Sequence, residues 1–153
     1  MIFKQKPFPF SLLVLVILIA LHIVGSYHSW YWAYSWFDVV VHIVSGLWVA
    51  LLILWLASVF GQINSLKEYK TKSLLIALIS AVLFGVIWEL LENFGHLTYV
   101  SDKGYSLNTA LDLLNGILGA LLAYLYFVRR KKCVEEHVDN LHPFYNSTGI
   151  IKS

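Results

Sequence analysis

The stretch that decides the fold is WFDVVVHIVSGLWVALLILWLASVF, which occupies residues 36–60. It is apolar almost throughout, and its ionisable side chains are Asp38 and His42. A helix needs about 20 predominantly apolar residues to cross a bilayer. A run of this length without turn signals also favours a helix over a strand. We therefore expect residues 36–60 to form a membrane-spanning helix.

Three further stretches of similar composition lie at residues 8–25, 73–94 and 107–128. Of the 153 residues in the chain, 59% are hydrophobic and 13% are charged, whereas soluble domains carry roughly 25% charged residues. A domain of this size cannot hide so much apolar surface from water. The sequence thus predicts an all-α fold: a polytopic membrane protein whose residues 1–132 form a bundle of four transmembrane helices, followed by a short polar tail at 133–153.

Lysine and arginine residues are placed unevenly around these stretches. Two precede the first stretch, three lie in the loop at 61–72 and four follow the last stretch. The loop at 26–35 has none and is dense in tryptophan and tyrosine, and the loop at 95–106 has one lysine. Short loops rich in lysine and arginine stay in the cytoplasm, and aromatic rings settle at the membrane interface. We expect a multi-pass protein of the cell (cytoplasmic) membrane with both termini in the cytoplasm.

Ionisable residues inside the predicted helices are the most informative feature for function. A charged side chain at the bilayer centre costs about 3 kcal/mol even on insertion scales, so such residues usually face a bundle interior or a wet cavity. At a rise of about 1.5 Å per residue, His42, Glu89 and Asp112 lie roughly 8–10 Å below the outer ends of their helices. Three helices thus bring an ionisable group to one depth on the outer side of the membrane.

These side chains form a set with recognisable chemistry. Imidazole and carboxylate groups suit zinc, iron or manganese, so we expect His42, Glu89 and Asp112 to be ligands of a divalent metal. Glu89 and Glu92 lie one helical turn apart and are the candidate catalytic acid–base pair, because burial and like charge separate the pKa values of neighbouring carboxyl groups. The basic residues flank apolar runs rather than forming one face, so nucleic-acid binding is not expected.

Neighbouring polar residues share helix faces with this set, because residues three and four apart lie on one side of a helix. Asp38 is expected to orient His42, and Asn115 is expected to hold Asp112 or a bound ligand. The supporting residues are Asp38, Asn93, His96 and Asn115. Glycines at 46, 116 and 119 lie on or beside the same faces, and small residues let membrane helices approach closely.

The order and spacing of these residues resemble a known family. The motifs are Asp38-x-x-x-His42-x-x-x-Gly46, Trp88-Glu89-Leu-Leu-Glu92 and Asp112-Leu-Leu-Asn115-Gly116-x-x-Gly119-Ala120. They resemble the YjdF-like small inner-membrane proteins and, more distantly, VanZ-like proteins. The resemblance covers residues 37–125. VanZ-like proteins tend to carry glutamine after the mid-chain glutamate and arginine before the last helix, where this chain has Glu92 and Lys103. The resemblance implies a membrane protein of the cell envelope, with VanZ-like members associated with glycopeptide resistance, and it supplies no reaction.

Three functions remain open at this point. The first is an outward-facing site that binds a metal or the polar head of a lipid-linked envelope molecule and serves hydrolysis or group transfer. The second is a non-catalytic membrane scaffold or assembly factor whose buried polar network is structural. The third is a proton or ion pathway, which the almost wholly apolar inner halves of the helices disfavour. The oligomeric state stays open.

Overall fold

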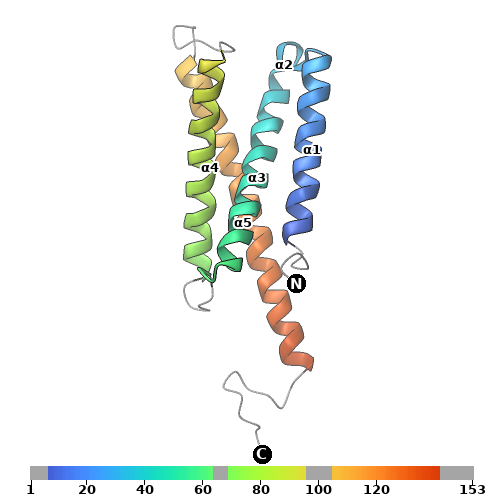
Figure 1. The fold of residues 1–153 in the computed structure, drawn as a ribbon, viewed down its shortest axis with the longest axis vertical. Helices are drawn as coiled ribbons and strands as arrows, with labels where there is room; N and C mark the ends of the chain where they lie inside the picture. The colour runs from blue at the N-terminus through green and yellow to red at the C-terminus, as the bar shows by residue number, and fades with distance from the viewer. Residues whose placement is uncertain (1–6, 64–68, 96–104, 142–153) are drawn as a thin grey trace, which may run out of the picture.

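The structure, a computed structural model, is an all-helical bundle (Figure 1). It describes residues 7–63, 69–95 and 105–141, with side chains for 8–63, 69–95 and 106–130. The helices are α1 (Pro7–Tyr27), α2 (Trp30–Ala33), α3 (Ser35–Val59), α4 (Tyr69–Phe94) and α5 (Tyr105–Leu141). Four of them contain segments long and apolar enough to cross a membrane. The prediction of an all-α fold with four spans is therefore confirmed.

Several helix bounds differ from the sequence prediction: α1 ends at Tyr27 rather than 25, and α4 begins at Tyr69 rather than 73. The expected aromatic loop contains α2, which begins after Ser29, whose φ of 57° lies in the left-handed region. The last helix was expected to end at residue 128, yet α5 continues to Leu141. The apolar span ends at Arg130, but the lysine, arginine and glutamate residues that follow are good helix formers. The length of the apolar run therefore predicts the membrane span but not the end of the helix.

The centre of the bundle is the pair α3 and α5, which pack closely along one another. A Cβ on Gly46 would lie 2.7 Å from the Cα of Gly116, and a Cβ on Gly119 would lie 2.6 Å from the backbone nitrogen of Leu47. No side chain fits in so short a gap, so the two helices touch backbone to backbone, as small residues permit in membranes. α1 packs on α3, and α4 packs on both α3 and α5. α1 and α4 thus flank the central pair on opposite sides (Figure 1).

The polar residues of interest are gathered at one end of this bundle. α3 and α5 begin at the end where α4 finishes, next to α2 (Figure 1). Pro7 at the start of α1 and Leu141 at the end of α5 lie toward the opposite end (Figure 1). The outer surfaces of the spans are covered by exposed leucine, isoleucine and valine side chains, as a bilayer requires.

Candidate functional site

Asp38, His42 and Asp112 form the closest cluster of ionisable side chains in the part of the chain that the structure describes, and we call them the triad. The Nε2 atom of His42 lies 3.5 Å from Oδ1 of Asp38 and 3.6 Å from Oδ1 of Asp112. One donor atom from each residue lies within 4.8 Å of the other two. Asp112 is buried, and the His42 side chain is only 12% exposed. The triad joins the first turns of α3 to α5 across the centre of the bundle.

The distances within the triad suit either ion pairs or a shared cation. N–H···O bonds in proteins measure about 2.7–3.2 Å between nitrogen and oxygen, so 3.5 and 3.6 Å are long for hydrogen bonds. Two ligands that each lie about 2.1 Å from one metal ion, at a tetrahedral angle, are about 3.4 Å apart. The two distances from His42 are close to this separation, and all three donor atoms lie within 4.8 Å of one another.

Each member of the triad is positioned by its own helix. Asp112 Oδ2 accepts a hydrogen bond of 2.7 Å from Nδ2 of Asn108, one turn earlier on α5, which leaves Oδ1 to face His42. Asp38 lies in the first turn of α3, where the helix dipole favours a carboxylate. Asp38 and His42 are four residues apart and therefore share a face of α3.

The two glutamates of α4 are held by other partners. Glu92 Oε1 accepts a hydrogen bond of 2.7 Å from Nε1 of Trp88. Glu89 is buried and its Oε2 accepts a hydrogen bond of 2.9 Å from the hydroxyl of Thr109 on α5. The other oxygen, Glu89 Oε1, is buried and has no hydrogen-bond partner within the described side chains. Glu89 therefore ties α4 to α5, whereas Glu92 is fixed within α4.

All five ionisable residues nevertheless belong to one electrostatic cluster. Asp112 interacts electrostatically with His42, Asp38, Glu89 and Glu92. Glu92 also interacts with His42 and Asp38, whereas Glu89 acts on Asp112 more strongly than Glu92 does. The structure thus gathers every acid and the histidine that the sequence singled out within the spans, and it orders them: Asp38 joins His42 and Asp112, with Glu92 and Glu89 around them.

The supporting residues have mixed positions. Asn93 and Asn115 are half-buried on α4 and α5, and His96 lies outside the described residues. The hydrogen bond to Asp112 comes from Asn108, which the sequence places on the same helix face as Asp112 and Asn115 but not among the site residues. Trp88 belongs to the quoted motif without a role of its own, and Thr109 is the positioning residue that sequence reasoning missed. Asn108 with Asp112, and Trp88 with Glu92, are each four residues apart, and that spacing was the available signal.

A second polar contact lies beside the triad. Nδ1 of His22 on α1 lies 2.9 Å from the hydroxyl of Tyr31 on α2. Burial, with the nearby charges of Asp38 and Glu92, raises the pKa of Tyr31 to about 12. The Tyr31 hydroxyl therefore stays protonated and can bond His22 throughout the physiological range.

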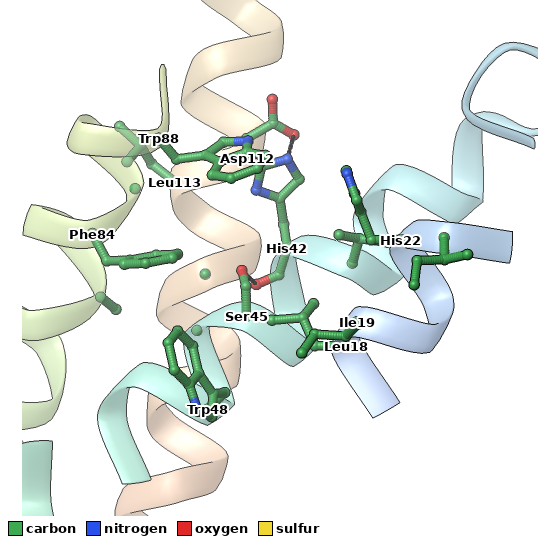
Figure 2. A pocket seen from close by; sticks show the side chains of 16 residues that line it. Leu18, Ile19, His22, His42, Ser45, Trp48, Phe84, Trp88, Asp112 and Leu113 are labelled. Carbon is green, nitrogen blue, oxygen red and sulfur yellow. Dashed lines mark hydrogen bonds and ion pairs between the residues drawn. The ribbon is translucent and has the colours of Figure 1, made fainter. Parts of the chain in front are cut away.

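A cavity of about 360 Å³ extends from the triad toward the middle of the bundle. All four spans line it, and Figure 2 shows His42 and Asp112 at one end and Trp48 at the other. Side chains of α1, including Ile19 and His22, face those of α4, including Phe84, across it (Figure 2). The lining is mostly apolar, so the polar chemistry of the cavity is concentrated at the triad.

The fold and this cluster define the class: a multi-pass integral membrane protein with an intramembrane histidine and carboxylate cluster. The chain belongs to the family described as "Predicted membrane protein (DUF2238)", whose model matches residues 2–132. No curated protein and no solved structure matches the chain. The family description supports a membrane protein and assigns no reaction. The finer resemblance to YjdF-like and VanZ-like proteins stays a prediction.

Proposed function

We propose that this protein binds one divalent metal ion at Asp38, His42 and Asp112, within the membrane and near its outer surface. The observation that carries the proposal is that one donor atom from each of these three side chains lies within 4.8 Å of the other two, with the His42 distances near those between ligands of one ion. A histidine with two carboxylates is a ligand set for zinc, iron or manganese. A positive charge between two carboxylates offsets their repulsion within a membrane, and a bound divalent ion would supply more of it than a protonated His42.

The triad can serve chemistry on the polar head of a lipid-linked envelope molecule. A bound divalent ion polarises a phosphoryl or carbonyl oxygen and acidifies bound water, which suits hydrolysis or group transfer. Glu92 interacts electrostatically with His42 and Asp38 and is the candidate acid–base group, while the Trp88 indole fixes its orientation. The resemblance to VanZ-like proteins supports a role at the cell envelope.

Metal analysis of the purified protein tests this assignment. The native chain is expected to carry about one divalent ion, as a single set of three protein ligands implies. His42→Ala and Asp112→Asn should lose most of it. Glu89→Gln is the matched control, because Glu89 is an acid of the same cluster that bonds Thr109 instead. If Glu89→Gln lost the metal and Asp38→Asn kept it, the ligand set would be His42, Glu89 and Asp112, and the triad would be refuted.

The orientation of the chain is part of the same proposal. We place both termini in the cytoplasm, which puts the triad toward the outer surface. Cys133 is the one cysteine of the chain and follows the last span, so it reports on this directly. A membrane-impermeant maleimide should label Cys133 in inverted vesicles and leave intact cells unlabelled. Labelling of intact cells alone would reverse the orientation and place the triad on the cytoplasmic side.

A structural role is the second candidate, and the hydrogen bonds of Glu89 and Glu92 favour it. Both carboxylates bond neighbouring side chains, and the bond of Glu89 joins two spans. In a scaffold, exchanging both Glu89 and Thr109 for apolar residues of similar shape should preserve the cellular phenotype. In an enzyme that uses Glu89, the same exchange should abolish the phenotype while the protein remains folded.

A further inference from the structure

The cavity beside the triad has the size and lining of a site for a hydrocarbon chain. Its walls are mainly aliphatic and aromatic, from Leu18 on α1 to Phe84 on α4 and Leu113 on α5. Its volume of about 360 Å³ is within the range of roughly 300–1,000 Å³ found for small-molecule sites. The polar groups lie chiefly at one end, where His42 and Asp112 are found (Figure 2). Such a site suits an amphiphile with its head at the triad.

The cavity is narrower than a helix. On α3 the lining runs from Val41 to Trp48, which at 1.5 Å per residue is about 10 Å of depth. A volume of about 360 Å³ over about 10 Å gives a mean cross-section of about 36 Å². A helix about 10 Å in diameter has a cross-section of about 80 Å². The size of the cavity therefore suits one extended chain better than a helix of a partner or a second copy.

The cavity borders the lipid along α1. Ile19 and Ile23 line it and are 49% and 61% exposed. α1 packs on α3, and its ring contact with α4 is between His22 and Trp88, whose centroids are 6.3 Å apart. A molecule in the bilayer can therefore reach the cavity sideways between α1 and α4, below this contact and without leaving the membrane.

Small residues create the space between these helices. Ser45 and Gly46 on α3, Ala81 and Gly85 on α4 and Gly116 on α5 all line the cavity. A Cβ on Gly116 would meet no atom within 4 Å, so a larger side chain there would enter open space. A Cβ on Gly46 would instead meet the backbone of Gly116, and one on Gly85 would meet the side chain of Leu113.

We propose that this cavity takes the single hydrocarbon chain of a membrane amphiphile, which enters between α1 and α4 and places its polar head at the triad. The position of the head rests on the proposed metal site, whereas the binding of the chain rests on the cavity alone. The substrate class of the protein is accordingly a lipid whose head carries oxygen ligands for a divalent ion, such as a phosphate.

The probe for this proposal is a dodecyl phosphate with a diazirine at the eighth carbon of its chain, so that the label reaches about as far from the phosphate as the cavity is deep. It is photolysed with the full-length protein in detergent, and the adducts are mapped by mass spectrometry. With the phosphate at the triad, the adducts should lie on Trp48, Phe84 and their neighbours at the closed end. Unlabelled dodecyl phosphate should compete, and inorganic phosphate at the same concentration should compete much less.

Two tryptophan variants on α1 provide the matched comparison. Ile19→Trp should fill the cavity and reduce these adducts at least several-fold, whereas Ile17→Trp should not. Ile17 and Ile19 are 45% and 49% exposed, and only Ile19 lines the cavity. Metal content is measured on the same samples, and its retention in Ile19→Trp shows that the bundle is intact.

The outcomes separate this proposal from the metal site. Equal labelling of both variants, adducts confined to the lipid-facing side chains, or cross-links between two copies would each overturn the chain site while leaving the metal site standing. A native protein that binds no metal but shows the expected adducts would refute the proposed function and retain the chain site.

Discussion

Truncating Asn108 to alanine is the sharpest test of how the triad is held. The Asn108 amide donates to Oδ2 of Asp112 at 2.7 Å, and this bond turns the other oxygen toward His42. Asn108 itself contributes no atom to the triad. The variant Asn108→Ala therefore leaves all three ligands in place and removes the group that orients one of them.

The size of the effect follows from this single bond. A hydrogen bond to a charged group is worth about 1.5–3 kcal/mol. Loss of an outer partner of a metal ligand weakens binding about 10- to 100-fold, or about 1.4–2.7 kcal/mol. The two estimates agree, so we expect the Kd for Zn²⁺ to rise about 10- to 100-fold in Asn108→Ala.

Zinc titration against a chelating indicator measures this Kd in purified protein. Leu107→Ala is the control, because Leu107 is the adjacent residue and its side chain is 67% exposed. His42→Ala sets the scale for complete loss of the site. If the Kd in Asn108→Ala stayed within about threefold of the native value, well below the expected range, while His42→Ala abolished binding, the orienting role of Asn108 would be refuted.

Three further predictions concern the bundle around the triad. Gly46→Ala should destabilise the α3–α5 pair by about 1–3 kcal/mol and lower the melting temperature of the protein. Gly116→Ala should not, because its Cβ would meet no atom within 4 Å. Equal melting temperatures of the two variants would contradict the close approach of α3 and α5. Thr109→Val should destabilise the protein by about 1–3 kcal/mol, because the Glu89 carboxyl loses its donor, and Thr109→Ser should restore denaturation behaviour. Tyr31 should ionise near pH 12 rather than 10, as seen in the absorbance difference between native protein and Tyr31→Phe. Because folded Tyr31 keeps a proton that the unfolded chain has lost, its contribution to stability is complete below pH 10 and falls between about pH 10 and 12.

The spans were predictable because the bilayer imposes a length on them. Apolar runs near 20 residues located all four helices, and the structure has them at nearly the same places. The end of α5 was not predictable in this way. Beyond Arg130 the helix continues through charged residues. There the sequence has no apolar run, so only the helix propensities of these residues predict that the helix continues.

The composition of the cluster was predictable, but its internal order was not. Asp38 and His42 share a face by their spacing alone, and helical rise put Glu89 and Asp112 at a similar depth. Depth does not decide which way a side chain turns. Glu89 bonds Thr109 on α5, and the side chain that lies with His42 and Asp112 within 4.8 Å is Asp38. That outcome depends on how α4 is rotated about its own axis relative to α5. This rotation cannot be deduced from a single sequence.

The cavity could not have been foreseen from the pattern of apolar residues. It exists because α1 rests on α3 while α4 rests on α3 and α5, which leaves a gap that small side chains do not fill. Residues such as Ala81 and Gly85 have the same apolar character whether they fill a core or border a cavity. Only the packing of the helices distinguishes the two cases.

The cavity and the triad are easier to explain as two parts of one binding site than as separate features. Placing two carboxylates beside a histidine within a membrane costs free energy. An empty apolar cavity also costs free energy, because the side chains that line it lose dispersion contacts. A divalent ion at the triad offsets the first cost, and a hydrocarbon chain in the cavity offsets the second. A molecule that carries both a chain and an oxygen-rich head would satisfy both requirements at once. For this reason, metal and lipid should bind cooperatively: the affinity for dodecyl phosphate should rise when Zn²⁺ is added to the native protein, and should not respond to Zn²⁺ in His42→Ala. If the affinity for dodecyl phosphate were independent of Zn²⁺ in both proteins, the cavity and the triad would be separate sites.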